Sequence, residues 1–241
     1  MSKPATHTIE VVIPDSGPLI SLSRADALDV LLVFKDAVRL VITDFVEFEV
    51  TRFRDIYPDA HRICDFLRDN AGRVEIQETG YGKAMKQMFL LREKYDQDEN
   101  FRNAMKAMNA EPPELPKDAG ELSIVSYANE LIQNPPGIPV LILAEDDFFL
   151  HSGTATPGNA HILSTHAFLE TLQTLGMVPD ANKIWERIKQ EKTSVNDAVV
   201  DRSAAKLQTD WTGAVDTKNT GRAQGRRRPS AKERGLGGRT R

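Results

Sequence analysis

The chain has 241 residues, of which 40% are hydrophobic and 27% charged, and its formal net charge is −4 at pH 7. This composition predicts one globular domain with an adequate core plus an extension. Cys64 is the single cysteine, which excludes an internal disulfide and a cysteine-cluster metal site. No stretch approaches the roughly 20 apolar residues that cross a bilayer, and the first ten residues lack a secretory apolar region. We therefore expect a cytoplasmic protein without a membrane partner.

The charge is unevenly distributed along the chain. Residues 217–241 carry nine Lys or Arg and one Glu, a net of +8, which leaves −12 on residues 1–216. A basic stretch with so few apolar residues cannot bury enough surface to fold alone, so we expect it to be disordered. It is either a non-specific arm for nucleic acid, with Arg226, Arg227 and Arg228 as candidate phosphate contacts, or a solvated tail without a partner. We therefore predict a folded domain over residues 1–192 and a flexible basic tail over residues 193–241.

Strand and helix patterns alternate along the folded part. Short apolar runs predict strands at residues 11–13, 38–42, 73–77, 139–144 and 161–163. Helical spacing predicts helices after Asp15, over residues 25–34, after Thr43 or Asp44, over 59–70, from 118, from 164 or 165, and over 180–192. Strands separated by such helices predict an α/β fold with a parallel sheet covered on both faces. Residues 80–117 interrupt the alternation with a long charged helical stretch over 83–108, which we interpret as an inserted arm or flap.

Asp15 is the first candidate site residue. It ends the first apolar run, and Ser16, Gly17 and Pro18 lead from it into a helix. This order places a carboxylate at the carboxyl end of a strand, the edge where open α/β sheets bind ligands. The alternative is that Asp15 or Ser16 only caps the helix. Other acids at the same edge would favour the first interpretation.

The helix after the second strand offers two acids, Glu47 and Glu49. Helical spacing puts Glu49 on the apolar face, with Val50 and Phe53, so that it points toward the interior. Glu47 follows Asp44 by three residues and can complete a capping box. Burying a carboxylate is costly unless it is paired or bound to metal. We therefore predict Glu49 in the site, the alternative being a boundary residue that reaches solvent.

Two further acids come from the second half of the domain. Glu121 shares a helix face with the apolar Val125, which places it in the site, and Asp118 is then a cap or a supporting residue. The alternative is that Asp118 and Glu121 form a capping box. Asp146, with Asp147 beside it, follows the strand at 139–144 and so lies at the same edge of the sheet, although helix capping again explains it.

Asp15, Glu49, Glu121 and Asp146 are thus predicted to converge, with Asp147 as a fifth acid. Clustered carboxylates raise each other's pKa unless a cation neutralises them, so the set predicts Mg²⁺ or Mn²⁺ bound through oxygen. Metals held by acids at a sheet edge can activate a water and stabilise the leaving oxygen of a phosphodiester. The chemistry that this implies is hydrolytic cleavage of nucleic acid.

The set of motifs, in this order and spacing, resembles the PIN-domain ribonucleases over roughly residues 8–175. The matching pieces are Asp15-Ser16 with Leu19-Ile20, residues 46–50, Asp118-Ala119-Gly120-Glu121, residues 141–147 and residues 164–169. The resemblance implies a three-layer α/β/α fold with about five parallel strands, metal-dependent cleavage of single-stranded RNA and frequent homodimers. It implies a catalytic metal site at Asp15, Glu49, Glu121 and Asp146, with Ser16 and Asp147 as helpers.

Many bacterial members that look like this are VapC-type toxins, which a small antitoxin protein holds inactive, and this is the subtype that we favour. The chain differs from typical toxins in its insert, its basic tail and Ala144, where the family often has Thr. Two other functions stay open from the residues alone. One is a non-catalytic RNA-binding or scaffold protein of the same fold. The other is a different α/β phosphate enzyme, although the chain lacks a P-loop Gly-x-x-x-x-Gly-Lys.

Overall fold

The main sheet of the protein has five strands, all of them parallel to their neighbours. In the computed structural model, the described residues are 6–7, 9–34, 37–133, 138–146, 148–151, 160–193 and 215–216. The strands are β2 (Val11–Pro14), β3 (Arg39–Thr43), β4 (Val74–Gln77), β5 (Val140–Leu143) and β6 (Ala160–Leu163). They lie in the order β4-β3-β2-β5-β6. The predicted α/β fold with a parallel sheet of about five strands is confirmed.

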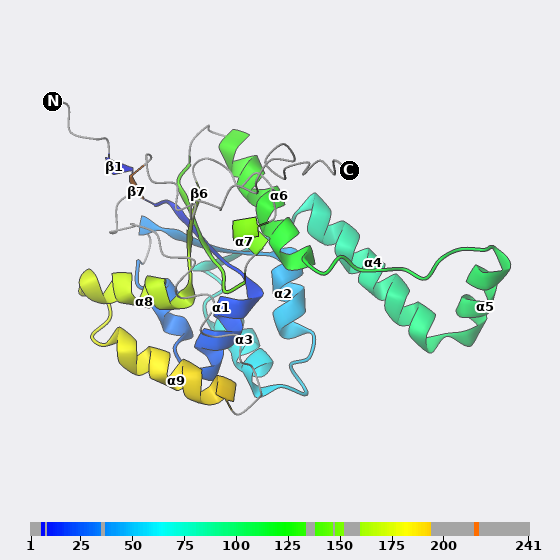
Figure 1. The fold of residues 1–241 in the computed structure, drawn as a ribbon, viewed down its shortest axis with the longest axis horizontal. Helices are drawn as coiled ribbons and strands as arrows, with labels where there is room; N and C mark the ends of the chain where they lie inside the picture. Colours follow the sequence, from blue (N-terminus) through cyan, green and yellow to red (C-terminus); the bar gives the residue numbers. More distant parts are fainter. Residues whose placement is uncertain are drawn as a thin grey trace, which may run out of the picture.

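Helices cover the sheet on both faces, which makes three layers. Figure 1 shows α1, α3, α8 and α9 together on one side of the strands and α6 on the other. The helices of the body are α1 (Ser16–Arg24), the 3₁₀ helix η1 (Leu28–Leu32), α2 (Asp44–Thr51), α3 (Pro58–Asp69), α6 (Ala119–Gln133), α7 (Phe148–His151), α8 (Thr165–Thr174) and α9 (Ala181–Thr193). Two short strands, β1 (Thr6–His7) and β7 (Val215–Asp216), form a separate antiparallel pair.

The core lies on both faces of the central strands. All four residues of β2 and all four of β5 are buried, because helices cover each face and leave no position for a solvated side chain. The two strands pair in register from Val11 opposite Val140 to Pro14 opposite Leu143. Beyond the last pair, the Asp15 amide donates a 2.8 Å hydrogen bond to the carbonyl of Leu143. The residues that follow these two strands therefore leave the sheet side by side.

The insert forms an arm of two helices, α4 (Gly80–Gln97) and α5 (Glu99–Ala107). Figure 1 shows the arm extending away from the sheet and its covering helices. Asp98 separates the two helices with an extended backbone (φ −105°, ψ 106°), and its side chain caps α5 by accepting from the Phe101 amide at 3.0 Å. The single long helical stretch predicted over residues 83–108 is therefore broken, because an aspartate in extended conformation caps a new helix better than it continues an old one.

Some predicted features lie outside the described residues. These are Asp147, the basic residues Arg226, Arg227 and Arg228, and the tail except for β7. Within the described ranges, no helix has both the length and the apolar character needed to cross a membrane.

Candidate metal centre

Asp15 occupies the junction between β2 and α1, where it is 5% exposed. Its backbone is in the N-cap position of α1 (φ −79°, ψ 174°), but its side chain makes no capping hydrogen bond. Among the described residues, no donor reaches its buried Oδ1 atom. Buried polar atoms are almost always paired, so an orphan carboxylate oxygen calls for a ligand. Capping, the alternative reading of this aspartate, therefore does not account for its side chain.

Three carboxylates face one another at the carboxyl edge of the sheet. Asp15, Glu121 and Asp146 each offer one oxygen, and these three oxygens all lie within 4.8 Å of one another. Glu121 comes from the first turn of α6, and Asp146 follows β5. Asp146 is fixed by its Oδ1, which accepts a 3.0 Å hydrogen bond from the Phe148 amide at the start of α7. Elements from both halves of the domain thus meet in one oxygen-lined site.

Burial and mutual repulsion raise the pKa of two of these acids. Burial, with a further contribution from the charge of Asp146, raises the pKa of Asp15 to about 8. Burial, followed by the hydrogen bond to Asp146 and the charge of Asp15, raises the pKa of Glu121 to about 10. Without a cation these groups retain protons at neutral pH, and a divalent cation between them would favour the charged forms. An oxygen-only donor set with an orphan buried oxygen fits a hard cation such as Mg²⁺ or Mn²⁺.

Glu49 lies beside this cluster, on α2 and at the edge of the same cleft. The Ser16 hydroxyl donates a 2.7 Å hydrogen bond to its Oε2. Burial raises the pKa of Glu49, and the Ser16 hydrogen bond and the positive charge of Arg52 oppose that rise. Its oxygens are not part of the three-oxygen group. Glu49 is therefore a fourth acid of the site, held by Ser16 at the side of the cluster.

Gly120 allows two of these acids to approach α6. A Cβ atom at Gly120 would lie 2.6 Å from Oε2 of Glu49 and 3.5 Å from Oδ1 of Asp15. Sequence reasoning used Gly120 only as part of a motif and did not identify this close approach. The glycine in the first turn of α6 thus leaves room for the Glu49 carboxylate, which would have to shift if this residue had a side chain.

The predicted burial of Phe53 on the same helix face as Glu49 is wrong. Phe53 was predicted to share the interior face of the helix with Val46 and Val50, which are indeed buried. Helix α2 ends at Thr51, and Phe53 is 41% exposed. The rejected acid, Glu47, points to a different place, with a carboxylate oxygen 3.9 Å from the Lys86 ammonium.

Asp118 belongs neither to the three-oxygen group nor to the residues that line the cleft. It directly precedes α6, is half-buried, and its backbone carbonyl accepts a 3.0 Å hydrogen bond from the Leu122 amide. Of the predicted set, the structure thus brings together Asp15, Glu121 and Asp146, with Glu49 and Ser16 beside them. Asp118 directly precedes α6, and its support of the site stays a prediction.

Sequence reasoning missed Glu145, which lines the same cleft. Its two oxygens accept hydrogen bonds from the Ser21 hydroxyl at 2.9 Å and the Thr165 hydroxyl at 2.5 Å. Its negative charge also contributes to the raised pKa of Asp15. In the sequence, only its position directly before Asp146 could have pointed to Glu145. Its two hydrogen-bond donors lie on α1 and α8, which are distant in the sequence.

The cleft at this edge has a volume of about 500 Å³. Acidic side chains form its interior, and three cationic residues, Arg24, Arg52 and Lys117, also line it. Arg24 is engaged with Asp59 across 3.0 Å, whereas Arg52 and Lys117 are exposed. Acids that can hold a cation, next to exposed cationic side chains, suit an anionic substrate that binds through both.

Comparison of the chain with models of known protein families, with curated proteins and with solved structures finds no significant match.

Proposed function

We propose that the chain is a metal-dependent endoribonuclease of PIN type, which hydrolyses phosphodiester bonds of single-stranded RNA. The observation that carries the proposal is the buried Asp15 carboxylate: its Oδ1 has no donor among the described residues, and one of its oxygens lies within 4.8 Å of carboxylate oxygens of Glu121 and Asp146. An uncompensated buried carboxylate such as that of Asp15 destabilises a fold, and a metal ion would neutralise it together with the half-buried Glu121 and Asp146. The order of the motifs along the chain, which resembles that of PIN-domain ribonucleases, supports the same reaction.

Each acid has a separate part in this proposal. Asp15, Glu121 and Asp146 would hold Mg²⁺ or Mn²⁺, which supplies Lewis-acid chemistry and charge neutralisation at the phosphate. Glu49, oriented by Ser16, borders the place where the substrate would lie. Glu145 is satisfied by two hydroxyl donors, so it contributes negative charge and holds α1 and α8 in place around the site.

Charged residues at the cleft support a polyanionic substrate. Arg52 and Lys117 are exposed there, and cationic side chains beside a metal site attract the phosphates that flank the scissile bond. The other parts of the proposal come from the sequence and the resemblance. They are single-stranded RNA as the substrate, a cytoplasmic location, a homodimer and a small antitoxin partner.

The test is cleavage of a mixed single-stranded RNA by purified full-length protein with Mn²⁺, with Mg²⁺ and with EDTA, for wild type and Asp146→Asn. The proposal expects cleavage with metal, none with EDTA, and a loss of at least about 1000-fold in Asp146→Asn, since the metal contributes several kcal/mol at the transition state. Absence of cleavage by wild type under every condition, with RNA binding retained, would instead favour a non-catalytic RNA-binding protein. Equal cleavage by both proteins would indicate a contaminant.

A further inference from the structure

An exposed aromatic surface lies where α2 ends and the chain turns toward α3. Phe53 is 41% exposed and Tyr57 is 54% exposed. Their rings meet edge to face, with centroids 6.0 Å apart and an interplanar angle of 86°. We call Arg52, Phe53 and Tyr57 the aromatic platform. Two exposed rings that pack on each other form a preorganised surface, since each holds the other in position.

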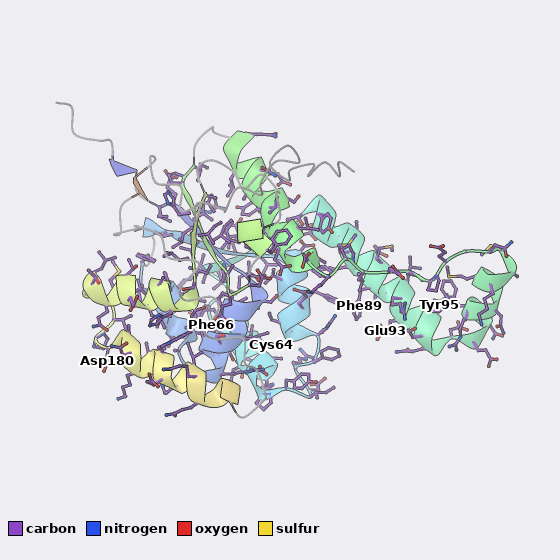
Figure 2. The ribbon with its side chains drawn as sticks, in the orientation of Figure 1. Cys64, Phe66, Phe89, Glu93, Tyr95 and Asp180 are labelled. Atoms are coloured by element: carbon purple, nitrogen blue, oxygen red, sulfur yellow. The ribbon has the colours of Figure 1, made fainter. Side chains whose placement is uncertain are left out.

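Arg52 joins the aromatic platform to the acidic cleft. Its guanidinium carbon lies 4.7 Å from the ring centroid of Phe53 and 4.8 Å from that of Phe89 on α4. Figure 2 labels Phe89 on the part of α4 near α2, with Tyr95 farther out along the arm. The same Arg52 side chain lines the cleft that holds the carboxylates. The platform is thus continuous with the candidate metal centre.

The helical arm has a part in holding this arrangement. Phe89 packs edge to face against Phe48 of α2, with ring centroids 4.9 Å apart. Arg52 lies over both of these rings as well as over Phe53, at 5.9 Å from Phe48. A guanidinium held by three rings keeps its charge near solvent while its orientation is fixed. The insert therefore fixes Arg52 between the cleft and the exposed rings.

We propose that the aromatic platform stacks the bases of a single-stranded RNA whose backbone enters the cleft past Arg52. The inference rests on the proposed nuclease function, for which it names the surface that holds the substrate. Unpaired bases stack on aromatic rings and guanidinium planes, and a nearby cation neutralises the adjoining phosphate. Two exposed cations, Arg52 in the platform and Lys117 in the cleft, favour contact with RNA phosphates, beside the five acids that also line the cleft.

The alternative occupant of this surface is a protein partner. Ile56 provides a way to distinguish protein binding from RNA binding. Ile56 lies between Phe53 and Tyr57 in the sequence and is 67% exposed. A protein interface would bury an exposed isoleucine together with the rings, whereas a base stacks on a flat ring and not on a branched aliphatic chain. Truncation of Ile56 is therefore the matched control for truncation of Phe53.

The experiment measures binding of two fluorescent strands to full-length protein in EDTA, so that no cleavage occurs. One strand is a 12-nucleotide RNA, and the other is an abasic strand of equal length with the same phosphates. Contacts of the basic tail with phosphate affect both strands equally, so the ratio of the two affinities reports base stacking. We expect Phe53→Ala and Tyr57→Ala to weaken RNA binding about 5-fold to 100-fold without changing abasic binding.

Two variants keep the interpretation independent of folding. Phe53→Trp retains an aromatic ring and should preserve the preference for RNA over the abasic strand. Ile56→Ala should leave both affinities unchanged. Equal affinity of wild type for the two strands would overturn the proposal, and so would an Ile56→Ala loss as large as that of Phe53→Ala, which would indicate a protein-binding surface.

The same protein samples distinguish this proposal from the nuclease itself. Metal-dependent cleavage by wild type with no preference between the strands would refute the platform alone. Preference for RNA in a wild-type protein that cleaves nothing with Mn²⁺ would support the platform as an RNA-binding surface and refute the nuclease.

Discussion

Two buried aspartates follow neighbouring strands of the sheet, yet their surroundings differ. Asp15 follows β2 and is 5% exposed, and Asp44 follows β3 and is 2% exposed. Oδ1 of Asp44 accepts hydrogen bonds from the Thr79 amide at 3.1 Å and the Thr79 hydroxyl at 3.0 Å, and Lys86 lies 3.6 Å from Oδ2. Oδ1 of Asp15 has no donor in the described part of the chain, and the Asp15 carboxylate lies beside those of Glu121 and Asp146.

The difference shows that burial alone does not mark a functional acid. Asp44 fixes the start of α4 on α2, because its donors belong to the turn that opens α4 and to α4 itself. Gly82 allows this contact, since a Cβ atom there would overlap the Asp44 carboxylate. Asp15 has other carboxylates nearby where Asp44 has donors, so its charged form becomes favourable only when a cation is added. Substitutions at the two positions should therefore have opposite consequences.

The largest expected effect is a difference in RNA cleavage between variants of the two aspartates. Asp15→Asn should reduce metal-dependent RNA cleavage by about 1000-fold or more, because it removes a charged ligand from the metal site. Asp44→Asn keeps an acceptor for Thr79 and should retain activity within about 10-fold. Initial cleavage rates with saturating Mn²⁺ check both. Comparable losses in the two variants would mean that the cluster has no special part in catalysis.

For the free energy of unfolding, we expect substitution of Asp44 to cost more than substitution of Asp15. Asp44→Ala leaves the Thr79 donors and Lys86 without their acceptor, which should lower the free energy of unfolding by about 3 kcal/mol. In the metal-free protein the Asp15 carboxyl retains its proton at neutral pH, so Asp15→Asn replaces one neutral group by another and should not destabilise that form. Urea unfolding in EDTA measures both values. A larger loss for Asp15→Asn would contradict the structural assignment of Asp44.

The raised pKa of Asp15 predicts how stability depends on pH. Its pKa is 3.8 in the unfolded chain and about 8 in the folded protein, so between these values the folded state binds the extra proton. The free energy of unfolding of metal-free protein should therefore fall as pH rises from 5 to 8, by about 2 kcal/mol after allowance for coupling among the acids. Unfolding in EDTA at several pH values tests this. Asp15→Asn should reduce the slope, with the remainder due to Glu121, and Mn²⁺ should stabilise wild type more at pH 8 than at pH 5.

The smallest predicted effect concerns the approach of Glu49 to α6. Gly120→Ala places a methyl group against Oε2 of Glu49, which must then move away from Ser16. Because only one carboxylate shifts, we expect a loss of cleavage rate of about 5-fold. Gly72→Ala is the matched control, since a Cβ atom there meets nothing within 4 Å. Equal rates for the two variants would show that Glu49 tolerates the shift.

Much of the fold could be predicted because each signal is local. The apolar runs of β2 and β5 predict buried strands, and an acid after each run places Asp15 and Asp146 at one edge of the sheet. Glu121 could be identified because helical spacing sets it on the face of the buried Val125. These predictions depend on continuous apolar runs and on the helical period of 3.6 residues, which the chain displays directly.

The rest depends on contacts between residues far apart in the sequence. Glu145 is held by Ser21 and Thr165, which lie 124 and 20 residues away, so no local pattern identifies it. Either Thr43 or Asp44 was expected to cap α2; Thr43 takes the N-cap position, and the Asp44 side chain accepts from Thr79, 35 residues later. Phe53 was assigned to the interior because the end of α2 at Thr51 could not be located.

The most direct test of the central claim is calorimetric titration of full-length protein with Mn²⁺ at pH 7. Wild type should bind Mn²⁺ and release protons, since Asp15 and Glu121 retain protons in the metal-free site. Asp15→Asn should weaken Mn²⁺ binding at least about 100-fold, because removing a metal ligand costs more affinity than removing a residue that supports a ligand. Asp44→Asn should bind Mn²⁺ like wild type. Absence of Mn²⁺ binding by wild type at millimolar concentration, or equal binding by Asp15→Asn, would contradict a metal centre at these carboxylates.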